Sequence, residues 1–134
     1  MDIKIVEDNK DAILSELNDA IQNALESIGL VAEGHVKSYE TAVDTGTLRN
    51  SITHTLVSDD TVAIGSDVEY APYVEFGTGI YADSGGRQSP WWYKDSKGEW
   101  HFTHGQKPVH FLRDGIMNHL KEYEEVAKQA LEGF

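Results

Sequence analysis

Tyr70-Ala-Pro-Tyr-Val-Glu-Phe-Gly-Thr-Gly79 is the stretch of sequence around which the rest of the chain is organised. Tyr70, Tyr73 and Phe76 are spaced by three, so they share one side of a single helical turn. Pro72 can open this turn because proline is tolerated at a helix start. The two glycines that follow let the backbone take positive φ, which ends the turn. We therefore predict a packed corner with apolar anchors, and not a solvated linker.

A second stretch, Val43-Asp-Thr-Gly-Thr-Leu-Arg-Asn-Ser-Ile52, has the residues of a turn. The side chains of Asp44 and Thr45 can accept hydrogen bonds from backbone amides two or three residues on, and Gly46 permits a left-handed conformation. The simplest interpretation is a cap. Alternatively, Arg49 pairs through its planar guanidinium with Asp44 or with a carboxylate of a neighbouring subunit. The sequence does not choose between them.

The N-terminal third predicts one long amphipathic helix. From about Asn9, apolar residues follow at alternating steps of three and four, which is the pattern of a single buried stripe, and we expect the helix to end near Val43. Gly29 and Gly34 each cost about 1 kcal/mol inside a helix, so the helix either bends there or packs closely against the sheet. The stripe consists of Ile13, Leu17, Ala20, Ile21, Ala24, Ile28 and Val31.

Two β-hairpins are predicted downstream. The segments 51–57 and 61–65 alternate and are β-branched, so they form the first hairpin, with His54 exposed or cross-strand and without catalytic partners. Trp91-Trp-Tyr93 and Glu99-Trp-His-Phe102 flank a turn and form the second. Its aromatic residues either stack over the core or form an exposed platform. The expected buried residues of the first hairpin are Ile52, Leu56, Val62 and Ile64.

Two further segments complete the predicted architecture. Residues 80–90 are rich in glycine and serine and are expected to form an exposed, flexible loop. Residues 109–132 are amphipathic and predict one C-terminal helix, with Pro108 rigidifying the chain before it and Phe111 fastening its start as a staple does. The fold class is therefore α+β: one domain over residues 1–134, with an antiparallel sheet of about four strands packed against a long N-terminal helix and a C-terminal helix.

Composition limits the function classes. The 134 residues carry a formal net charge of −12, which disfavours tight nucleic-acid or anionic-membrane binding. The chain has no cysteine, hence no disulfide or thiolate metal site. It shows neither a targeting segment at its start nor the ~20 consecutive apolar residues of a membrane span. Residues 1–44 hold ten acidic residues against three lysines, which is typical of a solvated helix face.

No pattern in the chain predicts catalysis. A cysteine nucleophile, a Gly-x-Ser-x-Gly elbow and a phosphate-cradling loop are all missing from the sequence. His101, His104 and His110 are the one arrangement similar to a metal set, but no His-Glu-x-x-His helix accompanies them. We expect no catalytic residue, no metal and no cofactor; a histidine metal hydrolase is the weakest hypothesis.

Three ordered motifs carry a family resemblance. They are Asp44-Thr-Gly-x-Leu-Arg-x-Ser-Ile52, the stretch 70–79, and Pro108-x-x-Phe-Leu112 before the last helix. Together they resemble the small head–tail joining or tail-completion proteins of long-tailed bacteriophages and prophages, over roughly residues 10–132. The resemblance implies a structural virion-assembly subunit, terminator-like in role, that forms a ring at the neck or tail end through which DNA passes. An acidic, non-adhesive lumen would suit such a ring.

The resemblance also implies partners and a location. Partners would be other copies of the chain, which can be monomeric before assembly, and the tail-tube, portal or adaptor, or other neck proteins, with no membrane partner. The protein would be found in the neck or tail of the virion, and in the host bacterial cytoplasm during assembly. Candidate subunit-interface residues are Arg49, Tyr70, Tyr73, Glu75, Phe76, Tyr81, Arg87, Trp91 and Trp92. Candidate turn and motif residues are Asp44, Thr45, Gly46, Gly77, Gly79, Pro108 and Phe111.

An alternative from a different class is a carbohydrate- or small-ligand-binding module. Trp91, Trp92 and Trp100 concentrate in the second predicted hairpin, together with Tyr93. Aromatic side chains of this kind provide stacking surfaces for sugar rings and also occur in protein interfaces. The sequence leaves both interpretations open.

Overall fold

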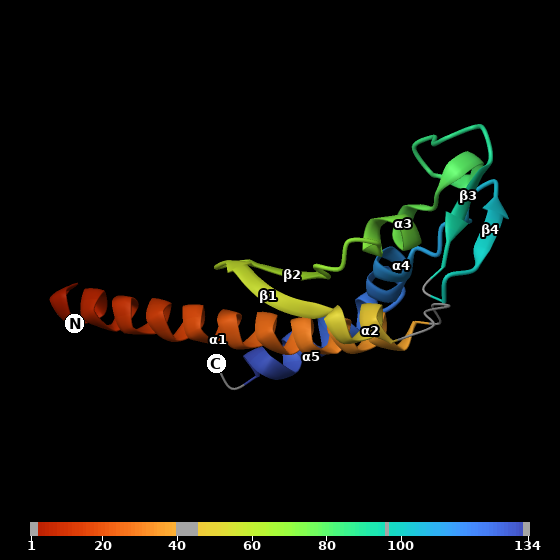
Figure 1. Ribbon diagram of the computed structural model, residues 1–134. Coiled ribbons are helices and arrows are strands. Elements are labelled where there is room, and N and C mark those ends of the chain that lie inside the picture. Colours follow the sequence, from red (N-terminus) through yellow and green to blue (C-terminus); the bar gives the residue numbers. More distant parts are fainter. Residues whose placement is uncertain (1–2, 40–45, 96, 133–134) are drawn as a thin grey trace.

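The protein is described here as a computed structural model covering residues 3–39, 46–95 and 97–132, with side chains from residue 10 onward. It is built from helices and two hairpins (Figure 1). In chain order the elements are α1 (Ile3–Ser38), α2 (Thr47–Ser51), β1 (Thr53–Ser58), β2 (Thr61–Gly65), α3 (Ala71–Phe76), the 3-10 turn η1 (Gly79–Tyr81), β3 (Trp91–Lys94), β4 (Trp100–Thr103), α4 (Phe111–Met117) and α5 (Leu120–Leu131).

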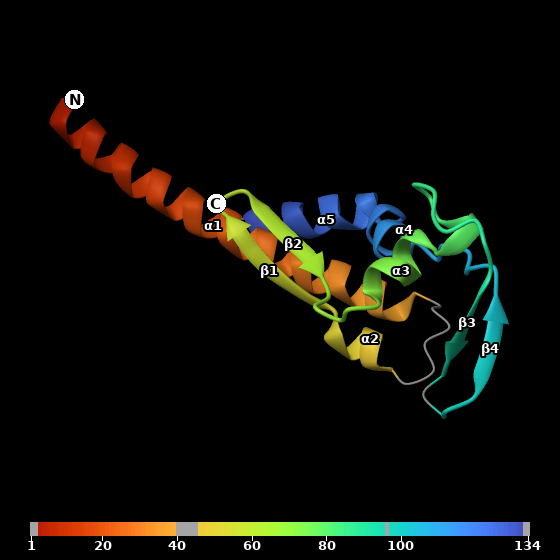
Figure 2. The ribbon, with the colours of Figure 1, turned by 45° about the horizontal axis from the view of Figure 1, so that its top comes forward.

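Helix α1 is the spine of the molecule. Its 36 residues span about 54 Å at 1.5 Å per residue, and α5 and the β1–β2 hairpin lie along it (Figure 2). The helix is continuous through Gly29 and Gly34 and begins before Asn9, where we expected it to start. The expected end near Val43 lies outside the described residues. In the described part of the chain, no helix is long and apolar enough to cross a membrane.

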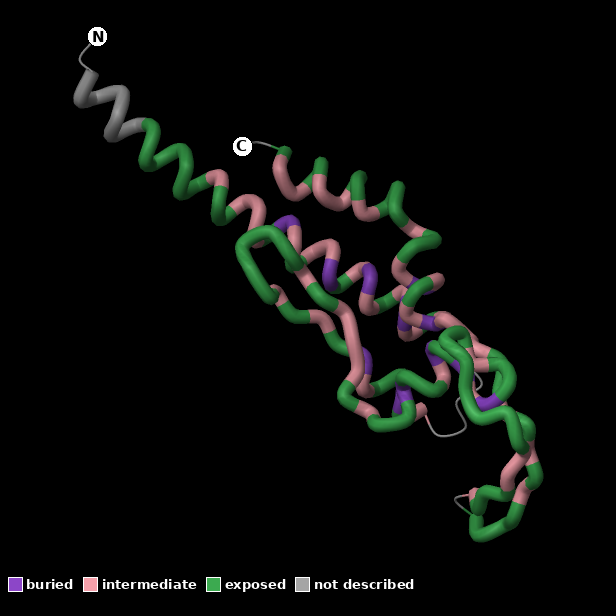
Figure 3. The backbone as a smooth tube through the Cα atoms, turned by 90° about the horizontal axis from the view of Figure 1, so that it is seen from above, coloured by how far each residue is buried: buried purple, intermediate pink, exposed green. Residues whose placement is uncertain are grey.

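The core lies where the second half of α1 meets α2, α3 and α4. Val36, Leu48, Ile52, Ala71 and Phe111 are buried together there, and Figure 3 shows the buried positions gathered in this part of the tube. Phe111, the predicted staple, is only 1% exposed and is among the largest fully buried side chains described. It therefore belongs to the centre of the core.

The first hairpin is confirmed, and the single sheet is not. Strands β1 and β2 pair antiparallel, with Thr53 opposite Gly65 and an irregularity between Leu56 and Ser58. Strands β3 and β4 also pair antiparallel, but with each other alone, so the described strands form two separate two-stranded sheets. Between them, α3 and η1 carry the chain away from β2, which leaves the second hairpin far from the first (Figure 1).

The C-terminal region forms two helices where one was predicted. α4 ends at Met117 and α5 begins at Leu120, and the Tyr123 hydroxyl donates to the Ile116 carbonyl oxygen across the break at 2.6 Å. Gly115 is buried against α1: a Cβ there would lie 3.0 Å from the Cα of Val36. Because the steps of three and four continue through the break, periodicity alone did not reveal it.

We expect Gly29 and Gly34 to respond oppositely to alanine. A Cβ at Gly29 would lie 2.7 Å from His54 Cδ2 and 2.8 Å from Val62 Cγ2, whereas a Cβ at Gly34 meets nothing within 4 Å. Gly29→Ala should therefore lower the free energy of unfolding by about 1–3 kcal/mol. Gly34→Ala should raise it by up to about 1 kcal/mol through helix propensity. Urea unfolding of both variants measures the difference; equal effects would contradict this packing.

Candidate assembly interface

The aromatic corner is helical as predicted, but its aromatic residues face outward. In α3, Ala71 and Glu75 are the buried residues, one turn apart on the inner side. Tyr73 is 60% exposed and Phe76 55% exposed. The prediction that these aromatic residues anchor a packed corner is therefore wrong. The six-residue helix α3 buries only one side, and Ala71 and Glu75 occupy that side.

Glu75 holds the start of α4. Its carboxylate accepts hydrogen bonds from the backbone N–H groups of Leu112, at 2.7 Å, and Arg113, at 3.2 Å. A negative group at a helix N-terminus satisfies amides that have no partner within the helix and is stabilised by the helix dipole. Glu75 was a candidate interface residue, and the structure buries its side chain within the subunit at 5% exposure, where it caps α4.

Beside Glu75, His110 completes a small polar cluster. His110 takes a left-handed backbone conformation (φ 55°) directly before α4. Its Nδ1 lies 3.6 Å from Glu75 Oε2 and its Nε2 lies 3.1 Å from Asp83 Oδ2. The imidazole thus links α4 to the segment after η1, which was expected to be a flexible loop.

The Gly77-Thr-Gly79 motif joins the corner to the base of the second hairpin. The N–H of Thr78 donates to the Gln106 carbonyl at 2.9 Å, and the N–H of Ile80 donates to the His104 carbonyl at 3.1 Å. A Cβ at Gly79 would collide with the His104 carbonyl oxygen. Because the two backbones cross this closely and both glycines have positive φ, the motif serves the fold, as predicted for a turn.

The second hairpin, residues 91–103, is hereafter called the aromatic arm. Its strand register places Trp92 opposite Phe102 and Lys94 opposite Trp100, so these four side chains share one face, the outer face. Trp92, Trp100 and Phe102 are 62%, 63% and 53% exposed. The rings of Trp92 and Phe102 are 5.3 Å apart, and Lys94 Nζ lies 5.9 Å from the Trp100 ring. Of the two interpretations of this hairpin, the exposed platform describes the structure.

The opposite face of the arm lines a groove of about 580 Å³. Trp91 and Tyr93 contribute from β3, Tyr73 contributes from α3, and Arg87 lies over the Trp91 ring at 5.4 Å. Thus Tyr73, Arg87 and Trp91, all candidate interface residues, come together, whereas Trp92 lies on the other face. The lining is completed by Thr78, Thr103, Gly105 and Gln106.

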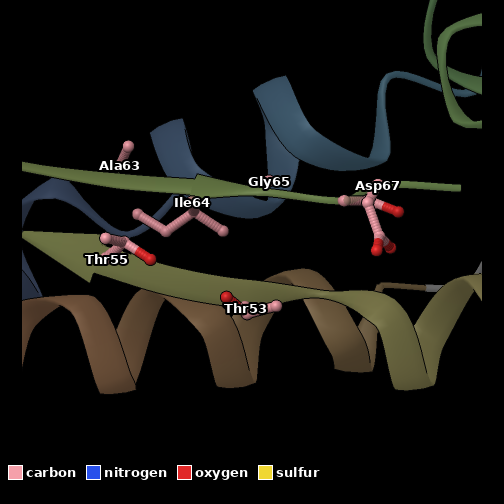
Figure 4. A pocket seen from close by; sticks show the side chains of 7 residues that line it. Thr53, Thr55, Ala63, Ile64, Gly65 and Asp67 are labelled. Atoms are coloured by element: carbon pink, nitrogen blue, oxygen red, sulfur yellow. The ribbon is translucent and has the colours of Figure 1, made fainter. Parts of the chain in front are cut away.

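A second hollow, of about 360 Å³, lies on the β1–β2 hairpin (Figure 4). Thr53 and Thr55 contribute from β1, and Ile64 and Asp67 from β2 and the segment after it. Asp67 is the one charged residue among those lining it.

Residues 5–77 match the family model described as "Bacteriophage HK97-gp10, putative tail-component". The chain belongs to this HK97-gp10-like family. It is thus a bacteriophage tail component, in agreement with the phage resemblance noted from the motifs. The match runs from α1 to the end of α3, so the aromatic arm lies beyond it. No curated protein and no solved structure matches the chain.

In this tail component, His54 has the partners that sequence reasoning missed. Its ring donates to Glu26 Oε1 at 2.7 Å and contacts Glu33 Oε1 at 3.1 Å, which links β1 to α1. The Glu26 and Glu33 carboxylates raise the pKa of His54. The hydrogen bond from His54, together with nearby Lys37, lowers the pKa of Glu33. The sequence did indicate paired carboxylates on the helix, because Glu26 and Glu33 are seven residues apart and share one helix face.

Two groups of described residues bring possible metal-ligand atoms within 4.8 Å of one another. Asp95, Glu99 and His101 meet in the turn of the arm, but Asp95 already accepts from two backbone amides and from His101, which lowers its pKa. His35 and His119 stack 3.5 Å apart and nearly parallel beside Glu122. Imidazole lone pairs lie in the ring plane, so stacked rings do not aim at one ion.

The remaining candidates are placed as follows. His101, His104 and His110 are not grouped as possible ligands of one ion among the described residues. Arg49 lies exposed on α2, and Gly46 before it has the predicted left-handed φ of 71°. Exposed Tyr81 lies 6.0 Å from Lys107 Nζ, and Pro108 lies against Gly77. Asp44 and Thr45 lie outside the described residues, so the pairing of Asp44 with Arg49 stays a prediction.

We expect Glu75→Ala to destabilise the fold. The change leaves two backbone N–H groups at the start of α4 without their acceptor and should cost about 2 kcal/mol of unfolding free energy. Glu69→Ala, an exposed acidic residue two positions before α3, is the matched control and should change stability little. Chemical denaturation compares the two. An effect of Glu75→Ala no larger than that of the control would contradict the capping role.

The His54 contacts predict a pH dependence. A raised folded-state pKa contributes stability that is fully present below the ordinary histidine value of 6.5 and is lost as pH rises through the folded value. The lowered pKa of Glu33 contributes above its ordinary value of 4.5 and is lost in acid. The unfolding free energy of the wild-type protein should therefore exceed that of His54→Gln most at pH values between 4.5 and 6.5. This difference should shrink at higher pH, by at most about 1 kcal/mol because Glu26 is solvated.

Urea unfolding of both proteins at pH about 5.5 and about 8.5 measures this change. His104→Gln, at an exposed histidine of the same chain, is the control for general charge effects. An advantage that grows with pH would contradict the assignment.

Proposed function

We propose that this tail component is a head–tail joining or tail-completion subunit that assembles into a ring at the neck or tail end, through which DNA passes. The observation that carries the proposal is the family match together with the aromatic side chains exposed on the outer face of the arm. An exposed aromatic patch of this kind marks a protein-interaction surface. The action of the subunit is geometric: it supplies contact surfaces and no chemistry.

The charge of the chain supports a channel role. Each chain has a formal net charge of −12. A ring of such chains would repel the phosphate backbone and would not hold DNA that must move through it. The proposed partners are other copies of the chain, the tail tube, and portal, adaptor or other neck proteins. The subunit would reside in the virion after assembly in the host cytoplasm, and it would act without catalysis or cofactor.

A second candidate function is carbohydrate or small-ligand binding. The groove of about 580 Å³ favours it, because Trp91 and Tyr93 offer stacking surfaces beside the hydrogen-bonding groups of Thr78, Thr103 and Gln106. Trp92 and Trp100 lie on the outer face and do not line this groove. Tryptophan fluorescence titrated with sugars tests this candidate, and Trp91→Ala should abolish a response that arises in the groove.

The joining role is tested by removing the gene from the phage or prophage that encodes it. Electron microscopy should then show filled heads and separate tails, and few joined particles, because the neck cannot close. Supplying the wild-type chain should restore joined particles and place it in purified virions by mass spectrometry. Normal joined particles without the chain would overturn the proposal.

A further inference from the structure

The outer face of the aromatic arm is apolar and locally basic in an otherwise acidic protein. Three exposed aromatic side chains, Trp92, Trp100 and Phe102, share this face with Lys94. Residues 91–103 hold two lysines, Lys94 and Lys97, and two acidic residues, Asp95 and Glu99. Lys94 lies on the outer face, whereas Asp95 is bonded to His101, whose side chain lies on the opposite face. A surface of this composition is complementary to one that is apolar and acidic.

The free end of α1 is such a surface. The tip of the first hairpin reaches α1 at Gln22, whose Nε2 donates to the Asp59 carbonyl at 2.9 Å. Before this point the apolar stripe continues uncovered, with Ile13 54% exposed and Leu14 51% exposed. At 100° per residue, Asp11 and Glu16 border the two sides of this stripe, and Lys10 lies on the stripe at its N-terminal end. Residues 10–19 hold three acidic residues against this one lysine.

The two surfaces lie at opposite ends of the elongated molecule. Figures 1 and 2 both show the start of α1 at one end and the β3–β4 hairpin at the other. The arm therefore cannot reach the α1 end of its own chain. A contact between them requires a second copy.

We propose that the outer face of the aromatic arm of one copy docks on residues 10–19 of α1 in the next copy. Trp92, Trp100 and Phe102 cover Ile13, Leu14 and the half-buried Leu17, and Lys94 and Lys97 meet Asp11 and Glu16. This inference rests on the proposed function, whose ring needs a contact between unlike surfaces. Repetition of such a head-to-tail contact closes a ring when the rotation permits and otherwise forms a filament.

The size of the contact explains why it would form during assembly. Three large aromatic side chains, each about half exposed, contribute about 300–450 Å² on one partner, which is well below the ~800 Å² per side of a stable interface. A single contact is therefore weak in dilute solution. A tail end that holds several copies together raises their effective concentration and permits the contacts to close.

Disulfide trapping tests the contact in a chain that has no cysteine of its own. Lys10→Cys and Glu99→Cys place one thiol beside each surface and leave every aromatic and apolar residue in place. A chain with the first change is mixed with an isotope-labelled chain with the second under mild oxidation. The mixed dimer should form several-fold faster than the dimer of Lys10→Cys with Lys121→Cys, a control on the polar side of α5. Equal rates would overturn the proposal.

Charge reversal provides the second measurement. Lys94→Glu combined with Lys97→Glu should lower the trapping rate several-fold, and Asp11→Lys with Glu16→Lys on the other copy should restore it. Lys121→Glu with Lys128→Glu changes the net charge equally and should leave the rate unchanged. Circular dichroism confirms that each variant is folded. No loss with the arm variants, or equal loss with the α5 control, would contradict the docking.

The docking and the joining role fail in distinguishable ways. If the arm variants lose trapping but still restore joined particles, the docking is not the contact used in the tail, while the joining role stands. If gene removal leaves normal particles, the joining role fails, and the trapping rates still decide whether the two surfaces meet.

Discussion

Burial of one face of α1 is the constraint on which the rest of the structure depends. The first hairpin, α4 and α5 all pack along this helix, and the largest buried side chains described lie near its second half. Gly29 and Gly115 permit close approaches to α1 or from it, the first to the hairpin and the second to Val36. Hydrophobic burial is the dominant favourable term in folding, so these contacts position the first hairpin, α4 and α5.

The corner after β2 is held by polar and backbone contacts, and this leaves its aromatic residues free. Glu75 holds α4, and the Gly77-Thr-Gly79 backbone binds the segment 104–106. Neither contact uses Tyr73 or Phe76. A small domain that leaves large aromatic side chains exposed gives up burial energy, which is the expected compromise where a surface serves assembly.

The family match and the aromatic arm describe different parts of the protein. The match covers α1 to α3, the elements that build the spine and the corner. The arm lies beyond it and has the most exposed aromatic surface described. The family assignment therefore rests on residues 5–77, and the contacts proposed for assembly combine the arm with the free end of α1.

The sequence by itself determined the local structure: the long helix, both hairpins, the turn at Pro72 and the left-handed Gly46, because periodicity and turn residues act within a few positions. It also determined the family through its ordered motifs. Only the tertiary structure decided that the hairpins form separate sheets, that Glu75 is buried while Tyr73 is exposed, and that His54 meets Glu26 and Glu33. These outcomes depend on which surfaces far apart in the chain meet, and no local pattern encodes that choice.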